Sequence, residues 1–438
     1  MAHTGMRSWL IWFTGAFVYL LAVFHRASFG VAGLQAADRF EVGAAALSTF
    51  TVLQVAVYAV MQIPTGMLVD RFGPRRVLTA ALLFLALGQV LLGLATSYPL
   101  GLLARGVLGF GDALTFVSVL RLTAAHFSGR RYPLVASLTT AMGYVGNLVA
   151  TVPLSMALVH QGWTPTFLAV GVVTAVFAVA TVLTIRDTPD GRSVPSDDGG
   201  TAGGVTSQVR EAWRVPATRL GFWVHFTTMF APNVLTLLWG VPFLVEQEGF
   251  SRTAASSLLM VFVFGAMFGG PLVGALIGRR PSLRMPFVGS YIAAAVVVWA
   301  VLLSWSGQIP LAALILGFAI LSFGGPVSTI GFMLARDYNP LQRVGTATGV
   351  VNVGGFVATT AAALLVGVLV QASGGNYRIA LLAVVAVLVF GAVRLLTWWR
   401  RTRAAIFAAQ ERGDDVPVRI SRRRWDKPPA LAETAAVD

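Results

Sequence analysis

The chain has 438 residues, of which 56% are hydrophobic and only 11% are charged. Soluble domains carry about 25% charged residues, so this composition argues against a soluble enzyme. Basic residues outnumber acidic ones by 32 to 18, which gives a net charge of +14. We interpret these arginines as markers of membrane topology and not as a nucleic-acid surface.

Apolar segments long enough to cross about 30 Å of hydrocarbon as helices recur along the whole chain. The first is longer than the apolar part of a signal peptide and lacks a small-residue cleavage pattern, so we expect it to be retained. The fold class predicted is an all-α polytopic membrane protein with twelve transmembrane helices. The predicted spans are residues 9–35, 44–68, 77–97, 99–123, 133–158, 163–185, 218–245, 255–278, 286–304, 309–334, 343–370 and 376–399.

Arginines are concentrated in alternate loops between the predicted spans. The intervening loops carry only Arg39, Arg252 and Arg378. Because loops rich in Arg and Lys stay in the cytoplasm, we expect a multi-pass protein of the inner membrane with both termini cytoplasmic.

The chain divides into two similar parts. Residues 186–217 are rich in Gly, Ser, Asp and Pro, as is typical of a linker. This segment separates a six-helix half at 1–185 from a second at 218–399, and a solvated tail follows at 400–438. A shift of 208 residues aligns 66–76 with 274–284 and matches one glycine, one leucine and two arginines. Duplicated helical halves are common in secondary transporters.

Two motifs carry a family resemblance. The first is Gly66-x-Leu68-x-Asp70-Arg71-x-Gly73-x-Arg75-Arg76, and the second is Arg105-x-x-x-Gly109-x-Gly111. With these motifs on the expected helices, the chain resembles the major facilitator superfamily over essentially its whole length. The resemblance implies two pseudo-symmetric six-helix halves with a cavity between them.

The resemblance also implies a conformational latch. Physically, the Asp70 carboxylate can lie against the positive end of a neighbouring helix while arginines hold phosphates or carboxylates. The alternative is a basic loop that only sets topology. Gly278 replaces the aspartate in the second half, so any latch is asymmetric. The predicted latch residues are Gly66, Asp70, Arg71, Gly73, Arg75, Arg76 and Arg105.

Arg26 is the most informative ionisable residue within a span. It lies nine to twelve residues from the expected end of its helix, or about 15 Å, too deep to reach the surface easily. Its segment resembles the first helix of the organophosphate and organic-anion branches of the superfamily, which implies an arginine that binds the anionic group. A permanent ion pair with Asp112 is the alternative.

Asp112 is the only carboxylate well inside a predicted span. A buried carboxylate with an exchangeable partner is a plausible proton carrier, and a permanent salt bridge is the alternative. His225 is the second candidate for proton coupling. For His25 we expect packing or an interhelical hydrogen bond.

Other polar residues are candidates for substrate contact. By the internal repeat, Thr236 stands at the position equivalent to Arg26. Phosphate-ester antiporters of the resembled branch carry a second cavity arginine in this seventh span, and this chain lacks it. This departure favours a monoanionic or less charged substrate. The further substrate-binding candidates are Asn233, Tyr144, Asn147 and Asn352.

The function predicted is a secondary active transporter of a small organic, anionic solute, coupled to protons as a symporter and monomeric. A proton-driven exporter of drugs or hydrophobic compounds is the first alternative, and a non-transporting receptor or membrane enzyme is the second. The partners expected are the solute, protons and membrane lipid. No cofactor or metal site is predicted, since no Cys, His or carboxylate constellation fits one.

Overall fold

The computed structural model describes residues 5–189 and 205–421, and these residues form helices and no strand. We call the helices before the linker the N bundle. They are α1 (Met6–Val31), α2 (Gly33–Phe40), α3 (Ala44–Val60), α4 (Gln62–Phe72), α5 (Pro74–Leu94), α6 (Tyr98–Ala113), α7 (Phe116–His126), α8 (Tyr132–Gln161) and α9 (Trp163–Thr184).

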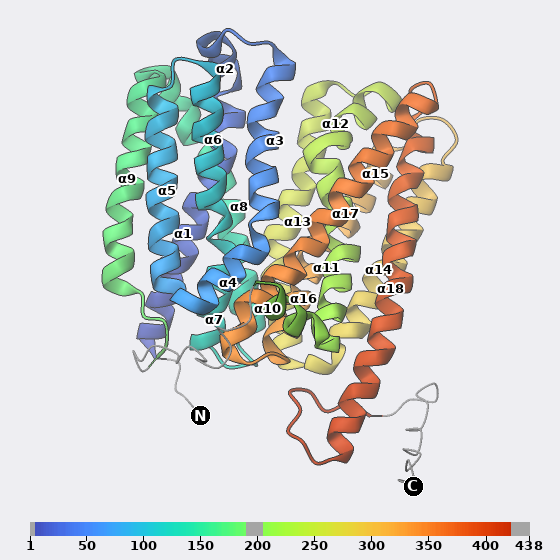
Figure 1. Cartoon of the computed structure of the whole chain (residues 1–438). Coiled ribbons are helices and arrows are strands. Elements are labelled where there is room, and N and C mark those ends of the chain that lie inside the picture. Colours follow the sequence, from blue (N-terminus) through green and yellow to red (C-terminus); the bar gives the residue numbers. More distant parts are fainter. Residues whose placement is uncertain (1–4, 190–204, 422–438) are drawn as a thin grey trace.

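A short helix, α10 (Val205–Arg214), precedes the second group of helices, which we call the C bundle. These are α11 (Pro216–Val234), η1 (Leu235–Trp239), α12 (Gly240–Pro242), η2 (Phe243–Gln247), α13 (Arg252–Arg279), η3 (Pro281–Leu283), α14 (Arg284–Ser304), α15 (Leu311–Ser322), α16 (Gly324–Asp337), η4 (Leu341–Arg343), α17 (Val344–Ala372) and α18 (Tyr377–Glu411). The two bundles stand side by side in Figure 1.

The prediction of a twelve-helix membrane protein is confirmed, with one difference. Among the described residues, 11 helical segments can each cross a membrane, and a bent pair makes up to 12. The bent pair lies at Thr49–Val60 and Gln62–Phe72, with an angle of 50°. Pro64 explains the break, because its ring removes a backbone donor and clashes with the carbonyl group of Val60.

The segment from α11 to η2 is also irregular. Pro232 lies inside α11, and Pro242 ends α12. Between and after them the backbone forms two π-helical turns, η1 and η2. Proline and π-turns are the usual causes of bends in long helices, so the half of this span farther from its start is not a straight rod.

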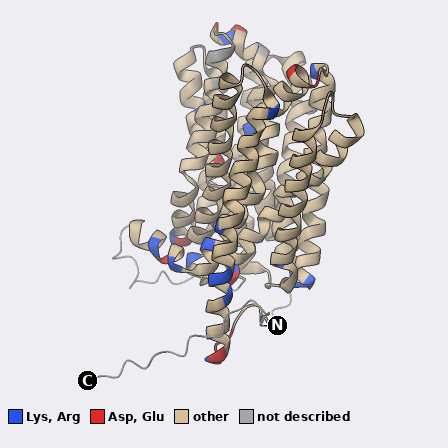
Figure 2. Ribbon diagram, turned by 90° about the vertical axis from the view of Figure 1, so that its right-hand side faces the viewer, with Lys and Arg blue, Asp and Glu red and all other residues tan. Residues whose placement is uncertain are grey.

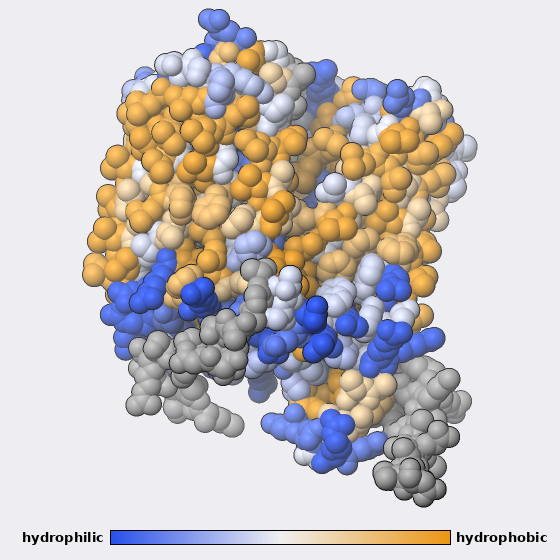
Figure 3. All heavy atoms as spheres, in the orientation of Figure 1, coloured by the Kyte–Doolittle hydropathy of each residue, from blue (hydrophilic) through white to orange (hydrophobic). Residues whose placement is uncertain are grey.

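Among the described residues, the helices of the two bundles pack closely against each other at one end of the molecule. Both α1 and α11 start there, and Figure 2 shows most Lys and Arg at this end, which we call the basic end. Helices of different bundles pack there as α4 on α17 and α8 on α13. In Figure 3 the surface between the bundles is hollowed at the opposite end. The structure is therefore closed at the basic end and open at the other.

Glycines permit the close packing of the two bundles. A Cβ added at Gly66 would overlap the backbone of Gly345, and one at Gly274 would lie 2.6 Å from the Pro133 carbonyl oxygen. Small residues at helix crossings allow backbones to approach closely in membrane proteins. A larger side chain at either position would push the basic ends apart.

Candidate functional site

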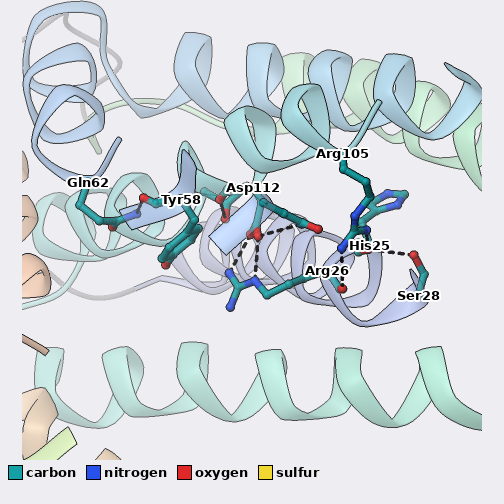
Figure 4. A network of polar contacts seen from close by, with 9 residues as sticks. His25, Arg26, Ser28, Tyr58, Gln62, Arg105 and Asp112 are labelled. Carbon is teal, nitrogen blue, oxygen red and sulfur yellow. Dashed lines mark hydrogen bonds and ion pairs between the residues drawn. The ribbon is translucent and has the colours of Figure 1, made fainter. Parts of the chain in front are cut away.

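The centre of the N bundle holds a charged pair. Arg26 of α1 donates from Nε to Asp112 Oδ2 at 2.7 Å and from Nη2 to Asp112 Oδ1 at 2.8 Å. The Asp112 side chain is fully buried, whereas 32% of the Arg26 side chain is exposed. Figure 4 shows the guanidinium of Arg26 turned toward the carboxylate. The carboxylate of the pair is therefore enclosed by the N bundle, whereas part of the Arg26 side chain remains exposed.

Two groups from α3 complete the surroundings of this pair. The Tyr58 ring lies 4.5 Å from the guanidinium carbon of Arg26, a cation–π contact. Gln54 donates from Nε2 to Asp112 Oδ2 at 3.4 Å. Asp112 therefore accepts from the neutral Gln54 as well as from Arg26. The Gln54 donor would remain if the Arg26 side chain turned away.

Arg105 is buried beside the pair, which corrects the expectation that grouped it with the latch. It lies in α6, donates from Nη1 to His25 O at 3.4 Å, and stacks over the Phe29 ring at 4.9 Å. Its charge is stabilised by Asp112 and opposed by Arg26. The motif spacing indicated a functional arginine but could not indicate its neighbours, because they come from α1. Two guanidiniums and one carboxylate leave this centre with one positive charge.

His25 has the structural role expected for it. Its Nδ1 lies 3.1 Å from Gln89 Oε1, and its Nε2 lies 2.9 Å from Thr174 Oγ1. The imidazole is fully buried. It joins α1 to α5 and α9 and so fixes the helix that carries Arg26.

The substrate-binding candidates are dispersed around the central space. Tyr144 and Asn147 lie half-buried on α8, and Asn233 is half-buried at the end of α11. Thr236 is exposed, and its hydroxyl donates to the Pro232 carbonyl at 2.9 Å. Tyr19 of α1 packs against α8, because a Cβ added at Gly143 would lie 2.7 Å from its ring.

Asn352 and His225 lie deeper, at the closed end of this space. Asn352 is buried and donates from Nδ2 to Gln62 Oε1 at 2.5 Å, which joins α17 to α4. His225 is buried against the Phe332 ring, with Nδ1 3.4 Å from Ser328 O. In this conformation the Asn352 side chain belongs to the contact between the bundles, and His225 is buried within the C bundle between α11 and α16.

Asp70 binds the N-terminus of α17 across the bundle boundary. Its Oδ1 accepts from Gly345 N at 2.8 Å, and its Oδ2 accepts from Thr346 N at 2.7 Å and Thr346 Oγ1 at 2.9 Å. Arg121 Nε donates to Oδ1 at 3.3 Å. This is a carboxylate at the positive end of a helix. Arg121 is not among the latch residues that the sequence predicted.

Gly66 of the first motif packs against α17, whereas Gly73 and Arg75 act within the N bundle. Arg75 donates from its backbone nitrogen to Asp187 Oδ1 at 2.7 Å and from Nε to Val182 O at 3.0 Å. Gly73 adopts a left-handed φ of 80° at this turn. Arg71 and Arg76 are exposed, and the Arg71 guanidinium lies 5.1 Å from the Phe72 ring.

A third polar contact between the bundles was not predicted. Arg336 donates from Nη2 to Phe127 O at 3.3 Å and lies over the Tyr132 ring at 5.5 Å. Its Nη1 pairs with Asp337 Oδ1 at 2.8 Å, and Arg284 pairs with Asp337 Oδ2 at 2.7 Å. In this cluster an arginine side chain donates to a backbone carbonyl group of the other bundle, whereas in the Asp70 cluster a carboxylate accepts from backbone N–H groups.

Comparison with known proteins identifies the family. The sequence profile described as "Major Facilitator Superfamily" matches residues 15–323 and 234–432. The chain belongs to this superfamily. Superfamily members are transporters and not enzymes, and this chain is a multi-pass membrane protein.

Several curated superfamily members are similar to this chain. The "Probable galactarate/D-glucarate transporter GarP" of Escherichia coli (strain K12) is 24% identical over 380 residues, which cover 79% of this chain and 84% of that protein. The "3-(3-hydroxy-phenyl)propionate transporter" of the same organism is 22% identical over 360 residues, covering 77% of this chain and 81% of that protein. The "Probable sulfoacetate transporter SauU" of Cupriavidus necator is 25% identical over 240 residues, covering 52% and 56%.

Two solved superfamily structures share the fold. The proton:xylose symporter XylE superposes with a TM-score of 0.66 at 14% identity, covering 91% of this chain and 97% of that chain. FucP, in the outward conformation, superposes with a TM-score of 0.67 at 16% identity, covering 88% and 99%. At these identities the likeness concerns the fold alone.

Proposed function

We propose that this superfamily member carries a small organic anion together with a proton across the inner membrane by alternating access. Both termini face the cytoplasm in this proposal, because the basic end carries most of the arginines. The single observation that carries the proposal is the partly exposed side chain of Arg26 paired with the fully buried carboxylate of Asp112.

The geometry of Arg26 suits a carboxylate of the solute. Asp112 occupies Nε and Nη2, while a guanidinium offers five N–H donors in all. The remaining donors can bind a solute oxygen, and the Tyr58 ring 4.5 Å away can pack against the solute's carbon skeleton. The one surplus positive charge of the centre favours a solute with one negative charge at this point.

Asp112 is the proposed proton carrier. When a solute carboxylate draws Arg26 away, Asp112 stays fully buried, and Gln54 remains as the hydrogen-bond donor to its carboxylate among the described residues. A buried carboxylate that loses its ion-pair partner takes up a proton more readily than the paired one does, and this holds for Asp112 although Arg105 stays nearby. Solute and proton would then bind together, as symport requires.

The names of the relatives agree with an anionic solute. Galactarate, D-glucarate, sulfoacetate and 3-(3-hydroxyphenyl)propionate are all anions of organic acids. They differ in size and in charge, so they support the class of solute and no single compound.

The proposal is tested by binding and uptake in three variants. A thermal-shift screen of organic acids, phosphate esters and drugs on the purified protein first finds a ligand, because a ligand stabilises the state it binds. Arg26→Lys should then weaken anion binding by about 10- to 100-fold, since an ammonium cannot reproduce the fork. Arg39→Lys is the matched control, because Arg39 bonds the carbonyl group of Ala95 at the open end.

Asp112→Asn should bind the anion but lose uptake driven by a pH gradient in proteoliposomes, because asparagine resembles a permanently protonated acid. Unchanged anion affinity in Arg26→Lys would overturn the anion site, and full coupling in Asp112→Asn would overturn the proton carrier. If the pair is only structural, each single variant should lose stability and a neutral double variant should recover it.

A further inference from the structure

A second cavity lies far from the central pair, at the basic end of the C bundle. It has about 70 Å³ of interior space, which is room for more than one water molecule. The walls come from the starts of α11 and α14, the end of α16 and the part of α18 beyond the membrane. The lining includes Leu220, Arg284, Tyr338, Trp399, Thr402 and Ile420.

Arg284 brings unsatisfied donors to this cavity. Only 5% of the residue is exposed, and its Nη2 pairs with Asp337 Oδ2 at 2.7 Å. Its Nε and Nη1 are buried and have no partner among the described residues. The Thr402 hydroxyl, also in the lining, is equally buried and unpartnered. A buried charged donor without an acceptor is costly, so these groups indicate a site for an acceptor with several oxygens.

The charge of the cluster points to an anion. Asp337 is shared by two arginines, because Arg336 Nη1 holds its other oxygen at 2.8 Å. Two guanidiniums and one carboxylate leave one positive charge that the cluster itself does not balance. Guanidinium forks match phosphate oxygens well, and a threonine hydroxyl can donate to the same group.

We propose that this cavity binds a phosphate-type oxyanion through Arg284 and Thr402, and that the oxyanion is the headgroup phosphate of an anionic phospholipid. The position supports a lipid, because Arg284 is the first residue of α14 and therefore lies at the membrane boundary. Tyr338 and Trp399 line the same cavity, and such aromatic residues prefer the headgroup level. The apolar lining side chains Leu220, Met285 and Ile406 suit the start of an acyl chain.

The segment after α18 forms one wall of the site. Ile420 exchanges two hydrogen bonds of 3.3 Å with the Gln410 side chain, and Arg403 donates to Ser421 O at 3.0 Å. Val418 and Ile420 thereby join the lining. Residues 412–421 fold back along α18, as Figure 1 shows, so part of the wall can move without disturbing a membrane span.

The test is lipid binding to the delipidated full-length protein, measured by native mass spectrometry and thermal shift. The probes are phosphatidylglycerol, phosphatidylcholine and inorganic phosphate. Phosphatidylglycerol should bind and raise Tm, and phosphatidylcholine should not. Arg284→Lys keeps the charge but removes the two donors, Nε and Nη1, that have no partner among the described residues. It should weaken phosphatidylglycerol binding by about 10-fold. Arg400→Lys, at an exposed position on α18, is the matched control and should bind as the wild type does.

Thr402→Val provides a second variant that leaves Arg284 in place if Arg284→Lys does not fold. If inorganic phosphate alone stabilises the protein and both variants lose this effect, the oxyanion site is supported. Its ligand is then free phosphate, and the assignment to a lipid headgroup is overturned. Equal phosphatidylglycerol binding by wild type, Arg284→Lys and Thr402→Val would overturn the proposal, as would no response to any probe.

Discussion

Replacing Asp70 by asparagine should shift the molecule away from the conformation closed at the basic end. The carboxylate accepts three hydrogen bonds from Gly345 and Thr346 at the start of α17, at 2.7 to 2.9 Å, and one from Arg121. Asparagine keeps one oxygen and loses the charge. Losing the interaction with the helix N-terminus and weakening these bonds should cost the closed state about 2–3 kcal/mol.

This cost corresponds to a change of about 30- to 150-fold in the ratio of the two states. The central pair is unchanged, so transport should slow while the affinity of the solute site changes little. The matched control is Asp187→Asn, because Asp187 bonds the Arg75 backbone within the N bundle and does not cross to α17. Its effect on the ratio of states should be much smaller.

The assay is a spin-label distance measurement across the open end. The chain contains no cysteine, so Ser97→Cys in the N bundle and Ser306→Cys in the C bundle can be labelled directly, and both positions are exposed. In Asp70→Asn the distance distribution should gain a shorter population as the open end closes. An unchanged distribution together with unchanged transport would refute the reasoning, and an affinity loss as large as the rate loss would show a role at the solute site.

Three further outcomes are expected. His25→Leu should lower the free energy of unfolding by about 1–3 kcal/mol, because Gln89 Oε1 and Thr174 Oγ1 lose their imidazole partner. The loss should be seen as a lower Tm, and an unchanged Tm would contradict the role of His25. Gly274→Val should favour the state open at the basic end, because a Cβ there meets the Pro133 carbonyl at 2.6 Å, and spin labels would report it. Arg336→Gln should shift the same equilibrium less than Asp70→Asn, since its bond to Phe127 O is one bond of 3.3 Å; an equal or larger shift would reverse the ranking of the two contacts.

The sequence was sufficient for the class of protein and for much of the helix map. Apolar segments, the two motifs and the low charge content predict a helical membrane transporter, because the bilayer imposes length and composition on every span. The irregular regions were less visible. The break at Met61 and the π-turns after Pro232 depend on how neighbouring helices accommodate each proline, which hydropathy does not report.

For the candidate site, the sequence by itself selected Arg26 and Asp112, because an ionised group in an apolar span is costly and conspicuous. Asp70 was selected by the loop motif and the family resemblance. Only the tertiary structure decided which partners these groups have. Arg105 lies beside the central pair, Arg121 lies beside Asp70, and Asn352 reaches Gln62 across the bundles. Each pairing joins residues of different helices, and the rotation of packed helices depends on the side chains of all their neighbours at once. The spacing of residues along one helix does not determine that rotation. The composition therefore determines the class of protein, and the packing of its helices determines which charged groups meet at its centre.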